Sequence, residues 1–458
     1  MNSEYPAYSN PAPEIEPEPK ASLLAAGVRR LLAWSASRRR TIRAVGMIAS
    51  ASLLASLLAL AGSLIQAHFV TPDDLGFLRK YSVIAGYTGF LNLGLFVILQ
   101  REYPVLMGRG EQAQARRAAA MVQSWVALVI GVVGTGLLGL LISELIQGHV
   151  REAAAWFMQI VGITATLYVG YLTTTFRSGH EFERLAKGTF ISSIAGLLVL
   201  PLFWVWPFVA LVMRSVTGSI ANTLYLHASR PIRVGWYLPG REFLNLVKRG
   251  FRLFVGDYLR HVFWLTVEIG LMYQIAGDRG VGLLVFAQVI ATTVAQLLFA
   301  VNQVYLPRIA QEFGRSGKIG VCLRMGTWPI VLNLGISAAV IVGVFFVLSP
   351  LIAYVFPKYV EAVPLIRILS LQTVIISLSL WMYMLTILEG YVPQFVAALV
   401  GLGVFVGVTA VLQAQGLREE AVAWGTLAGQ IAFAAIGLLW IAGKSRMENS
   451  AGVSVSAR

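Results

Sequence analysis

Four side chains that can be charged near neutral pH lie in the middle of one apolar stretch of this sequence, residues 251–276, where a membrane-spanning helix is expected. They are Asp257, Arg260, His261 and Glu268. A charge near the centre of a bilayer costs roughly 3 kcal/mol on insertion scales and persists mainly where it lines a water-filled pathway. We therefore expect this helix to border a polar cavity that binds an ion or a charged solute.

Helical periodicity gathers these groups on one face of the expected helix. At about 100° per residue, the residues that fall within about 40° of one line are Asp257, His261, Trp264 and Glu268, with Arg260 beside it. One interpretation is an internal ion pair of Asp257 with Arg260 or His261 that only neutralises buried charge. The other is a working site, in which Arg260 holds an anionic head group and Asp257 or Glu268 binds a coupling cation.

Glu268 is the better candidate for ion coupling. Asp257 has Arg260 and His261 within one helical turn, so its negative charge is expected to be compensated locally. Glu268 has no basic residue three or four positions away. A carboxyl group without a partner in a poorly hydrated cavity can take up a proton or a metal cation when the cavity opens to one side of the membrane.

A second basic residue, Arg214, lies within the apolar stretch 207–228 and has no acidic residue nearby in the sequence. Its planar guanidinium matches the oxygens of a phosphate group, so we interpret it as a candidate ligand for a phosphate-bearing substrate. The alternative is that the side chain extends toward the nearer membrane surface without binding anything.

Neutral polar side chains form a stripe on the expected helix 281–304. Its members are Gln288, Thr292, Gln296 and Gln303. Amides and hydroxyls of this kind suit the hydroxyl groups of a sugar, and Asn92, on the expected helix 81–100, is a candidate for the opposite wall. The alternative is that the stripe makes hydrogen bonds between helices and only holds the bundle together.

The elements that must position these groups are long apolar helices. The chain of 458 residues is 57% hydrophobic and 13% charged, with a mean hydropathy of +0.72, and apolar runs of about 20 residues recur along it. This composition predicts an all-α polytopic membrane protein with about twelve transmembrane helices. The expected spans are 44–70, 81–100, 118–143, 153–175, 188–203, 207–228, 251–276, 281–304, 323–348, 362–388, 391–412 and 421–442.

The basic residues predict the orientation of these spans. Of the 36 lysines and arginines, 27 lie in the two termini and in the loops that share one side with them. Basic loops stay in the cytoplasm, so we expect both termini to be cytoplasmic. The same asymmetry explains the net charge of +14 without a nucleic-acid partner. Since more than forty residues precede the first apolar run, no cleavable signal peptide is expected.

The first 43 residues differ from the rest in composition. Residues 1–20 are rich in proline and glutamate and predict a disordered tail, whereas residues 21–43 alternate leucines with arginines. The second pattern suits an interfacial helix on anionic membrane lipids of the cytoplasmic leaflet. The alternative is that residues 21–43 only set the orientation of the chain in the membrane.

A basic linker, residues 229–250, divides the spans into an N-lobe (44–228) and a C-lobe (251–442), followed by a tail (443–458). A repeat supports this division, because Asp73-Asp74-Leu75-Gly76 follows the first span and Gly277-Asp278-Arg279-Gly280 follows the seventh. Both copies begin on the predicted outer face. We therefore expect two parallel-repeat six-helix lobes with a substrate site at their interface.

Three segments of the first two spans carry a family resemblance. They are Phe69 to Gly76 (FVTPDDLG), Phe90 to Leu95 (FLNLGL) and Gln100 to Pro104 (QREYP). In order and spacing they resemble the bacterial polysaccharide-repeat (O-antigen or exopolysaccharide) flippases of the multidrug/oligosaccharidyl-lipid/polysaccharide (MOP) exporter superfamily. The resemblance implies a transporter of the bacterial inner membrane that flips undecaprenyl-diphosphate-linked oligosaccharides for polysaccharide or lipopolysaccharide biosynthesis. It also implies other membrane proteins of polysaccharide assembly as partners.

Two other functions stay open at this point. One is a cation-coupled small-molecule exporter of the same superfamily. The other is a membrane glycan polymerase or ligase, which generally needs a large outer loop, whereas the longest expected outer loop here is Ser349 to Glu361. The sequence contains no histidine–cysteine cluster with metal-ligand spacing and no phosphate-binding glycine loop, so we expect no cofactor and no enzymatic activity.

Overall fold

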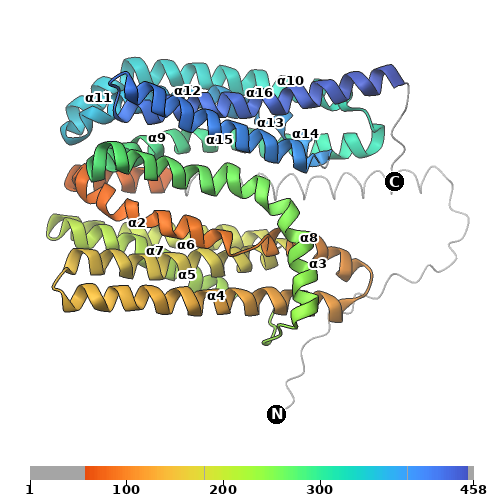
Figure 1. Ribbon diagram of the computed structural model, residues 1–458, viewed down its shortest axis with the longest axis horizontal. Helices are drawn as coiled ribbons and strands as arrows, with labels where there is room; N and C mark the ends of the chain where they lie inside the picture. Colours follow the sequence, from red (N-terminus) through yellow and green to blue (C-terminus); the bar gives the residue numbers. More distant parts are fainter. Residues whose placement is uncertain (1–56, 180, 389, 452–458) are drawn as a thin grey trace, which may run out of the picture. The chain divides into compact units, whose positions relative to one another are not determined.

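The computed structural model describes residues 57–451 apart from 180 and 389, and this part of the chain contains helices joined by turns and loops, with no strand (Figure 1). The longer elements are a helix at Leu57–Phe69, α2 (Pro72–Phe90), α3 (Leu95–Gly108), α4 (Gln112–Ile146), α5 (Val150–Ser178), α6 (Phe182–Leu198), α7 (Pro207–Ala228), α8 (Gly240–Tyr258), α9 (Trp264–Ser316), α10 (Ile319–Gly343), α12 (Val363–Ser377), α15 (Tyr391–Ala414) and α16 (Glu419–Ala451). Short elements join several of these: η1 (Leu200–Trp204), η2 (Leu259–Phe263), η3 (Val344–Leu348), α11 (Ser349–Val355), η4 (Pro357–Ala362), α13 (Ser379–Met382) and α14 (Met384–Ile387).

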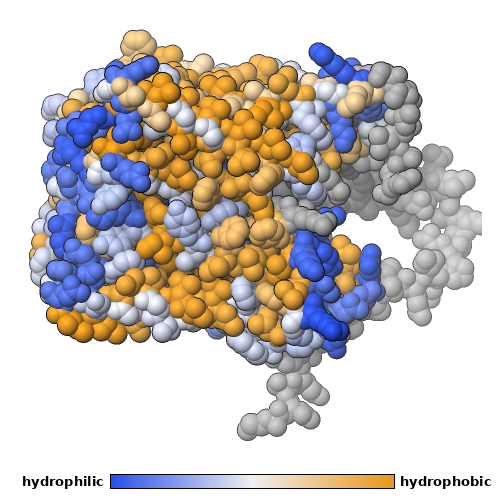
Figure 2. All heavy atoms as spheres, viewed as in Figure 1, coloured by the Kyte–Doolittle hydropathy of each residue, from blue (hydrophilic) through white to orange (hydrophobic). Residues whose placement is uncertain are grey.

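The described helices are those of a polytopic membrane protein. Eight of them are long and apolar enough to cross a membrane, or nine if α2 and α3, which meet at an angle of 44°, form one span. Figure 2 shows that most of one face is hydrophobic, with hydrophilic residues gathered at its two ends. The predicted all-α membrane fold is confirmed.

Three features account for the difference from the twelve expected spans. The expected spans 251–276 and 281–304 count as one continuous apolar stretch, although Gly277 between them is non-helical, with φ 64° and ψ −159°. Helix α7, which carries Arg214 and Asn222, is not among the helices that are apolar enough to count as spans. The first expected span is described only from Leu57 onward, and the predicted segments 1–20 and 21–43 lie outside the described residues.

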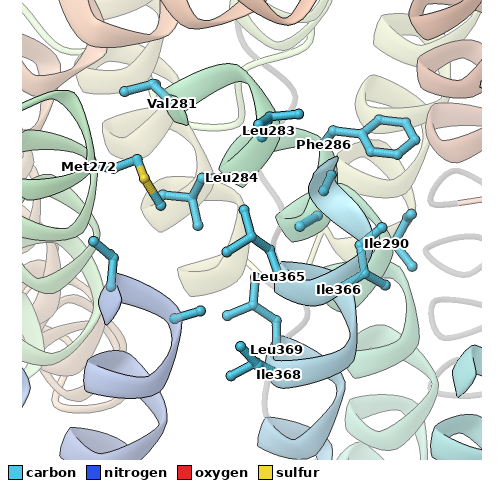
Figure 3. Packing of buried hydrophobic residues seen from close by; sticks show 14 of the residues in the cluster. Met272, Val281, Leu283, Leu284, Phe286, Ile290, Leu365, Ile366, Ile368 and Leu369 are labelled. Atoms are coloured by element: carbon cyan, nitrogen blue, oxygen red, sulfur yellow. The ribbon is translucent and has the colours of Figure 1, made fainter. Parts of the chain in front are cut away.

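Helix α9 is the centre of the packing in the second half of the chain. It contacts α2, α10, α12 and α16, and its buried side chains interlock with those of α12 (Figure 3). Met272, Leu284 and Leu365 are fully buried in this cluster. Burial of these apolar side chains away from both lipid and water fixes the position of α9, the helix that carries Glu268.

The first half of the chain packs around α4, α5 and α7, with α2 and α3 against α5. The break between α2 and α3 has a backbone cause: Leu93 and Gly94 have positive φ values of 53° and 78°. Gly94 also lies against the backbone of Gly250, where a side chain would overlap the Gly250 carbonyl group. Residues from Leu57 onward belong to one compact unit, and the division into an N-lobe and a C-lobe stays a prediction.

Helix α8 begins at Gly240, within the segment that the sequence suggests as a basic linker. Apolar residues at helical spacing, such as Phe243, Leu246 and Val247, explain why this segment is an amphipathic helix. In Figure 1 the α8 ribbon runs across the direction of α4 and α5, and it contacts both α3 and α15. The π-helical turn η2 then joins α8 to α9.

Candidate functional site

A cavity of about 520 Å³ lies among α2, η2, α9, α12 and α16. Its wall is largely apolar, with polar groups at intervals. The polar lining residues are Arg79, Arg260, His261, Trp264, Glu268, Gln288, Thr292, Gln372, Thr373, Ser379, Thr426 and Gln430. The volume is within the range of about 300–1,000 Å³ that is usual for small-ligand sites.

Glu268 is the only acidic residue among the described lining residues, and its side chain is 4% exposed. Its carboxylate accepts two hydrogen bonds from neutral groups: Gln288 Nε2 donates at 2.9 Å and Thr426 Oγ1 donates at 2.9 Å. Gln288 lies on α9 beyond the kink at Gly277, and Thr426 lies on α16. Neutral donors satisfy the oxygens of the carboxylate without cancelling its charge.

Arg260 and His261 lie on the π-helical turn η2, before the start of α9. A π-turn inserts an extra residue into the helical repeat, and such turns are common at functional sites. The Arg260 guanidinium lies 4.5 Å from the centre of the Phe433 ring, as a cation–π contact. Both residues also line a second cavity of about 180 Å³, which continues along α9 toward Asn302 and Leu306.

Arg79 is a lining residue that the sequence does not reveal as part of the site. It lies on α2, two turns after the helix begins, and the spans expected from hydropathy leave it in a loop on the predicted outer face. Its Nε atom is buried and has no hydrogen-bond acceptor among the described residues. The missed signal is the helix start at Pro72 after the capping residue Thr71, which places Arg79 deeper in the bundle.

Three further polar residues of the wall come from elements that the sequence does not connect with the site. Gln430 Nε2 donates to Gln372 Oε1 at 3.3 Å, and the amide nitrogen of Gln372 is buried without an acceptor among the described residues. The third is Thr426, the donor to Glu268. Single amides and hydroxyls within apolar helices are common packing residues, so the sequence gives no signal for these three.

Five of the residues expected from the sequence are brought together at this cavity: Arg260, His261, Glu268, Gln288 and Thr292. Thr292 Oγ1 donates to the Gln288 carbonyl oxygen at 2.7 Å. Gln296 is exposed and does not line the cavity, and the Asp257 side chain lies outside what the structure describes.

Arg214 and Asn92 lie elsewhere in the fold. The Arg214 guanidinium lies against the helix Leu57–Phe69, where it donates to Gln66 Oε1, to the Ala59 carbonyl oxygen at 3.3 Å and to Ser63 Oγ at 3.4 Å. Asn92 Oδ1 accepts a hydrogen bond from the Phe96 amide at 3.3 Å and so supports the first turn of α3.

Ion pairs join the two halves of the chain at the predicted outer end of α2 and α9. Lys80 Nζ lies 3.0 Å from Asp278 Oδ2, and Arg279 bridges Glu361, at 2.9 Å, and Asp73, at 3.5 Å. Two further contacts involve backbone oxygens: Tyr359 Oη donates to the Val70 carbonyl at 3.2 Å, and Lys358 Nζ donates to that of His68 at 3.3 Å.

The backbones of α2 and α9 also meet directly at this end. A Cβ atom at Gly76 would overlap the Asp278 carbonyl oxygen, and one at Gly282 would overlap the carbonyl oxygen of Pro72. Only glycine allows this approach. These contacts hold α2 and α9 together at the predicted outer end of the two helices.

The comparisons with known proteins agree with this architecture. No family model matches the chain, and no curated protein matches its sequence. The fold, however, matches solved structures. One is an "inward-facing conformation of a multidrug resistance MATE family transporter of the MOP superfamily", with a TM-score of 0.66 at 16% identity over 88% of this chain and 96% of that chain.

Two further matches bear on conformation and on related proteins. A "lipid II flippase MurJ, inward closed conformation" matches with a TM-score of 0.64 at 12% identity over 86% of this chain and 87% of that chain. An outward-facing MATE transporter gives 0.58 at 14% identity over 89% of this chain and 96% of that chain. The chain therefore has the fold of the MOP superfamily, with the higher score for the inward-facing structure.

Proposed function

We propose that this protein is a transporter of the MOP superfamily that flips polyprenyl-diphosphate-linked oligosaccharides across the bacterial inner membrane, for polysaccharide or lipopolysaccharide biosynthesis. The fold supports a transporter, because the structures that it matches are MATE transporters and a lipid II flippase. The substrate class rests on the charge of the cavity and on the family resemblance of the first two spans.

The observation that carries this proposal is the excess of positive charge in the cavity. Two arginines, Arg79 and Arg260, line it against one carboxylate, Glu268, with His261 as a further titratable group. Guanidinium groups suit phosphate oxygens, whereas an exporter of cationic drugs would be expected to present acidic groups to its cargo. A diphosphate is therefore the better match to this wall.

The remaining lining groups fit the rest of such a substrate. Amides and hydroxyls of Gln372, Gln430 and Ser379 can exchange hydrogen bonds with sugar hydroxyls. The polyprenyl chain would stay in the lipid, where it loses no apolar burial. A cavity of about 520 Å³ is large enough for the diphosphate and the first sugar, so longer glycans would extend beyond it.

Transport would follow alternating access. In this structure the ion pairs Lys80–Asp278 and Arg279–Asp73 hold α2 against the α9 kink at the predicted outer end. Opening the cavity to that side requires these contacts to break while the predicted inner end closes, as the two halves rock about the substrate. Glu268 and His261, with Asp257 as a third candidate, are proposed to bind the coupling ion.

A MATE-type small-molecule exporter is the second candidate. The size of the cavity favours it, because about 520 Å³ encloses an entire drug-sized solute but only the head of a lipid-linked glycan. An ion coupled through Glu268 fits either function. The nature of the transported molecule separates the two candidates.

The test is leaflet-resolved transport in reconstituted vesicles. The full chain is placed in vesicles that contain a lipid-linked oligosaccharide, and a membrane-impermeant glycosidase or lectin reports the fraction in the outer leaflet. We expect equilibration within minutes in protein-containing vesicles and none in protein-free vesicles. If the glycolipid stays in its leaflet while a cationic dye is exported under an ion gradient, the small-molecule exporter is correct and the flippase proposal is wrong.

A further inference from the structure

Arg79 carries a charge that the described part of the protein leaves uncompensated. Its side chain lines the cavity, and its Nε atom is buried without a hydrogen-bond acceptor among the described residues. A buried guanidinium without acceptors is costly, because neither water nor an anion replaces its lost hydration. Such a group is expected where a ligand supplies the missing acceptors.

Other arginines close to apolar surfaces differ from Arg79 in this respect. Arg151 pairs with Asp74, Arg367 Nε donates to Ser349 Oγ at 3.1 Å, and Arg214 donates to Gln66. Each of these guanidinium groups therefore has an acceptor supplied by the chain itself. Arg79 faces the cavity instead, and the nearest acid on the cavity wall, Glu268, already accepts two hydrogen bonds from neutral groups.

We propose that Arg79 is the anion-binding residue of the cavity, with a phosphate or diphosphate group as its ligand, and that the charge of Glu268 sets the affinity of this site. The inference deepens the proposed function, since it assumes that this cavity receives the substrate. It does not depend on a glycan or on translocation. The ligand could be the head group of a lipid or a free anion, because both present the same oxygens.

Charges on walls of a cavity of this volume lie on the order of 10 Å apart, so at an effective dielectric constant of about 20 one charge changes the affinity for an anion roughly tenfold. The other charged or titratable lining groups are Arg260 and His261, and both favour an anion. Glu268 alone opposes it, while α12 and α16 contribute only neutral polar groups to the described wall.

A consequence for coupling follows from this arrangement. When Glu268 binds a proton or a metal cation, its repulsion of the anion disappears, and by linkage the bound anion raises the affinity of Glu268 for the cation by the same factor. The coupling ion and the anionic head group would therefore bind together. Loss of the ion on one side of the membrane would weaken the hold on the head group at Arg79.

Direct binding tests this inference. The full chain is purified into nanodiscs of uncharged lipid, and calorimetry measures the affinity for two probes, inorganic pyrophosphate and farnesyl diphosphate. We expect Arg79→Gln to weaken binding of both probes at least tenfold and Glu268→Gln to strengthen it about tenfold. In the double variant the gain from Glu268→Gln should be lost. Arg79→Lys should retain part of the affinity, since a point charge replaces the planar fork.

Arg324→Gln is the matched control. This variant also loses a guanidinium group. The Arg324 side chain, however, donates from Nε to the Gly320 carbonyl oxygen of its own helix, at 3.4 Å, and it does not line the cavity. Binding of both probes should be unchanged in this variant. Unaltered thermal unfolding of each variant shows that the fold is intact. Binding of farnesyl diphosphate without pyrophosphate would identify a lipid head group as the natural ligand, and equal binding of both would identify a free anion as sufficient.

The inference is wrong if Arg79→Gln binds both probes as tightly as the unaltered protein, or if Glu268→Gln leaves the affinity unchanged. These results differ from a failure of the proposed function. If vesicles show no translocation of glycolipid but the probes bind through Arg79, the function is wrong and the anion site stands. If glycolipid is flipped while Arg79→Gln binds pyrophosphate normally, only this inference falls.

Discussion

Glu268 combines deep burial with partners that carry no charge, and this sets up the first prediction. Glu268→Gln keeps the size of the side chain and one acceptor for Thr426 but removes the site for a proton or cation. We expect the variant still to bind and flip substrate but to lose the dependence of transport on an imposed pH or sodium gradient. The vesicle assay, run with and without each gradient, measures this. A gradient dependence equal to that of the unaltered protein would make Glu268 a structural residue.

The cavity could be predicted from the sequence only in part. Charged and amide side chains in apolar helices stand out, so Arg260, Glu268 and Gln288 were identifiable as members of a polar site. Arg79 could not be placed, because its depth depends on where α2 begins and on the contact of α2 with α9. The Gln288–Glu268 hydrogen bond also escapes sequence reasoning, since the two residues are twenty positions apart across the kink at Gly277.

The contact between α2 and α9 gives the second prediction. Gly76→Ala places a methyl group where the Asp278 carbonyl oxygen lies, so the two helices must separate at the predicted outer end. We expect the closed state to be populated less. With the buried Cys322 replaced by alanine, a single cysteine at Thr292 on the cavity wall should react at least tenfold faster with an impermeant maleimide added from the predicted outer side.

The control for that experiment is Gly139→Ala on α4, where an added Cβ atom meets nothing within 4 Å. Its labelling rate at Thr292→Cys should equal that of the background protein. If Gly76→Ala labels at the same rate as Gly139→Ala, the close approach of α2 and α9 does not control access to the cavity.

Arg214 leads to a third prediction, about helix packing. Its guanidinium supplies hydrogen bonds to the helix Leu57–Phe69 and lies beside Gly62, where an added Cβ would be 2.7 Å from its Nη2 atom. Removing it leaves the Gln66 amide oxygen without that donor, so Arg214→Ala should lower the free energy of unfolding by about 1–3 kcal/mol. Thermal unfolding in detergent measures this. The expected order of stability is unaltered, then Arg214→Lys, then Arg214→Ala; equal stabilities would leave Arg214 free for a role in substrate binding.

Helix α8 shows why element boundaries are harder to predict than element types. Basic residues made residues 229–250 look like a linker, yet the apolar residues among them repeat at helical spacing, and the helix begins at Gly240. The π-helical turn at Leu259–Phe263 has no signal in the sequence, because it depends on how the chain fits between neighbouring helices. It also breaks the regular 100° step that placed Asp257 and Glu268 on one line.

The fold of the entire molecule was the most predictable level. Long apolar stretches must be helical in a bilayer, because only helices satisfy their backbone groups internally, and this constraint is independent of tertiary detail. Hydropathy separated the two helical segments that meet at Gly277, as the expected spans 251–276 and 281–304, but it could not recognise α2 and α3 as two helices that meet at an angle. The order of motifs in the first two spans supplied the superfamily resemblance, which the fold comparison supports.

The orientation of the chain in the membrane is the last prediction. Of the 36 lysines and arginines, 27 fall on the side of the two termini, which is therefore expected to be cytoplasmic. Arg241, at the start of α8, should face the cytoplasm. Tyr354, which is 88% exposed on α11, should face the periplasm. Single cysteines at these positions, in a chain without Cys322, can be tested with an impermeant maleimide on intact cells. We expect labelling at Tyr354→Cys without permeabilisation and at Arg241→Cys only after it. Labelling of Arg241→Cys in intact cells would invert the topology, and the ion pairs around Asp278 would then close the cytoplasmic end of the cavity instead.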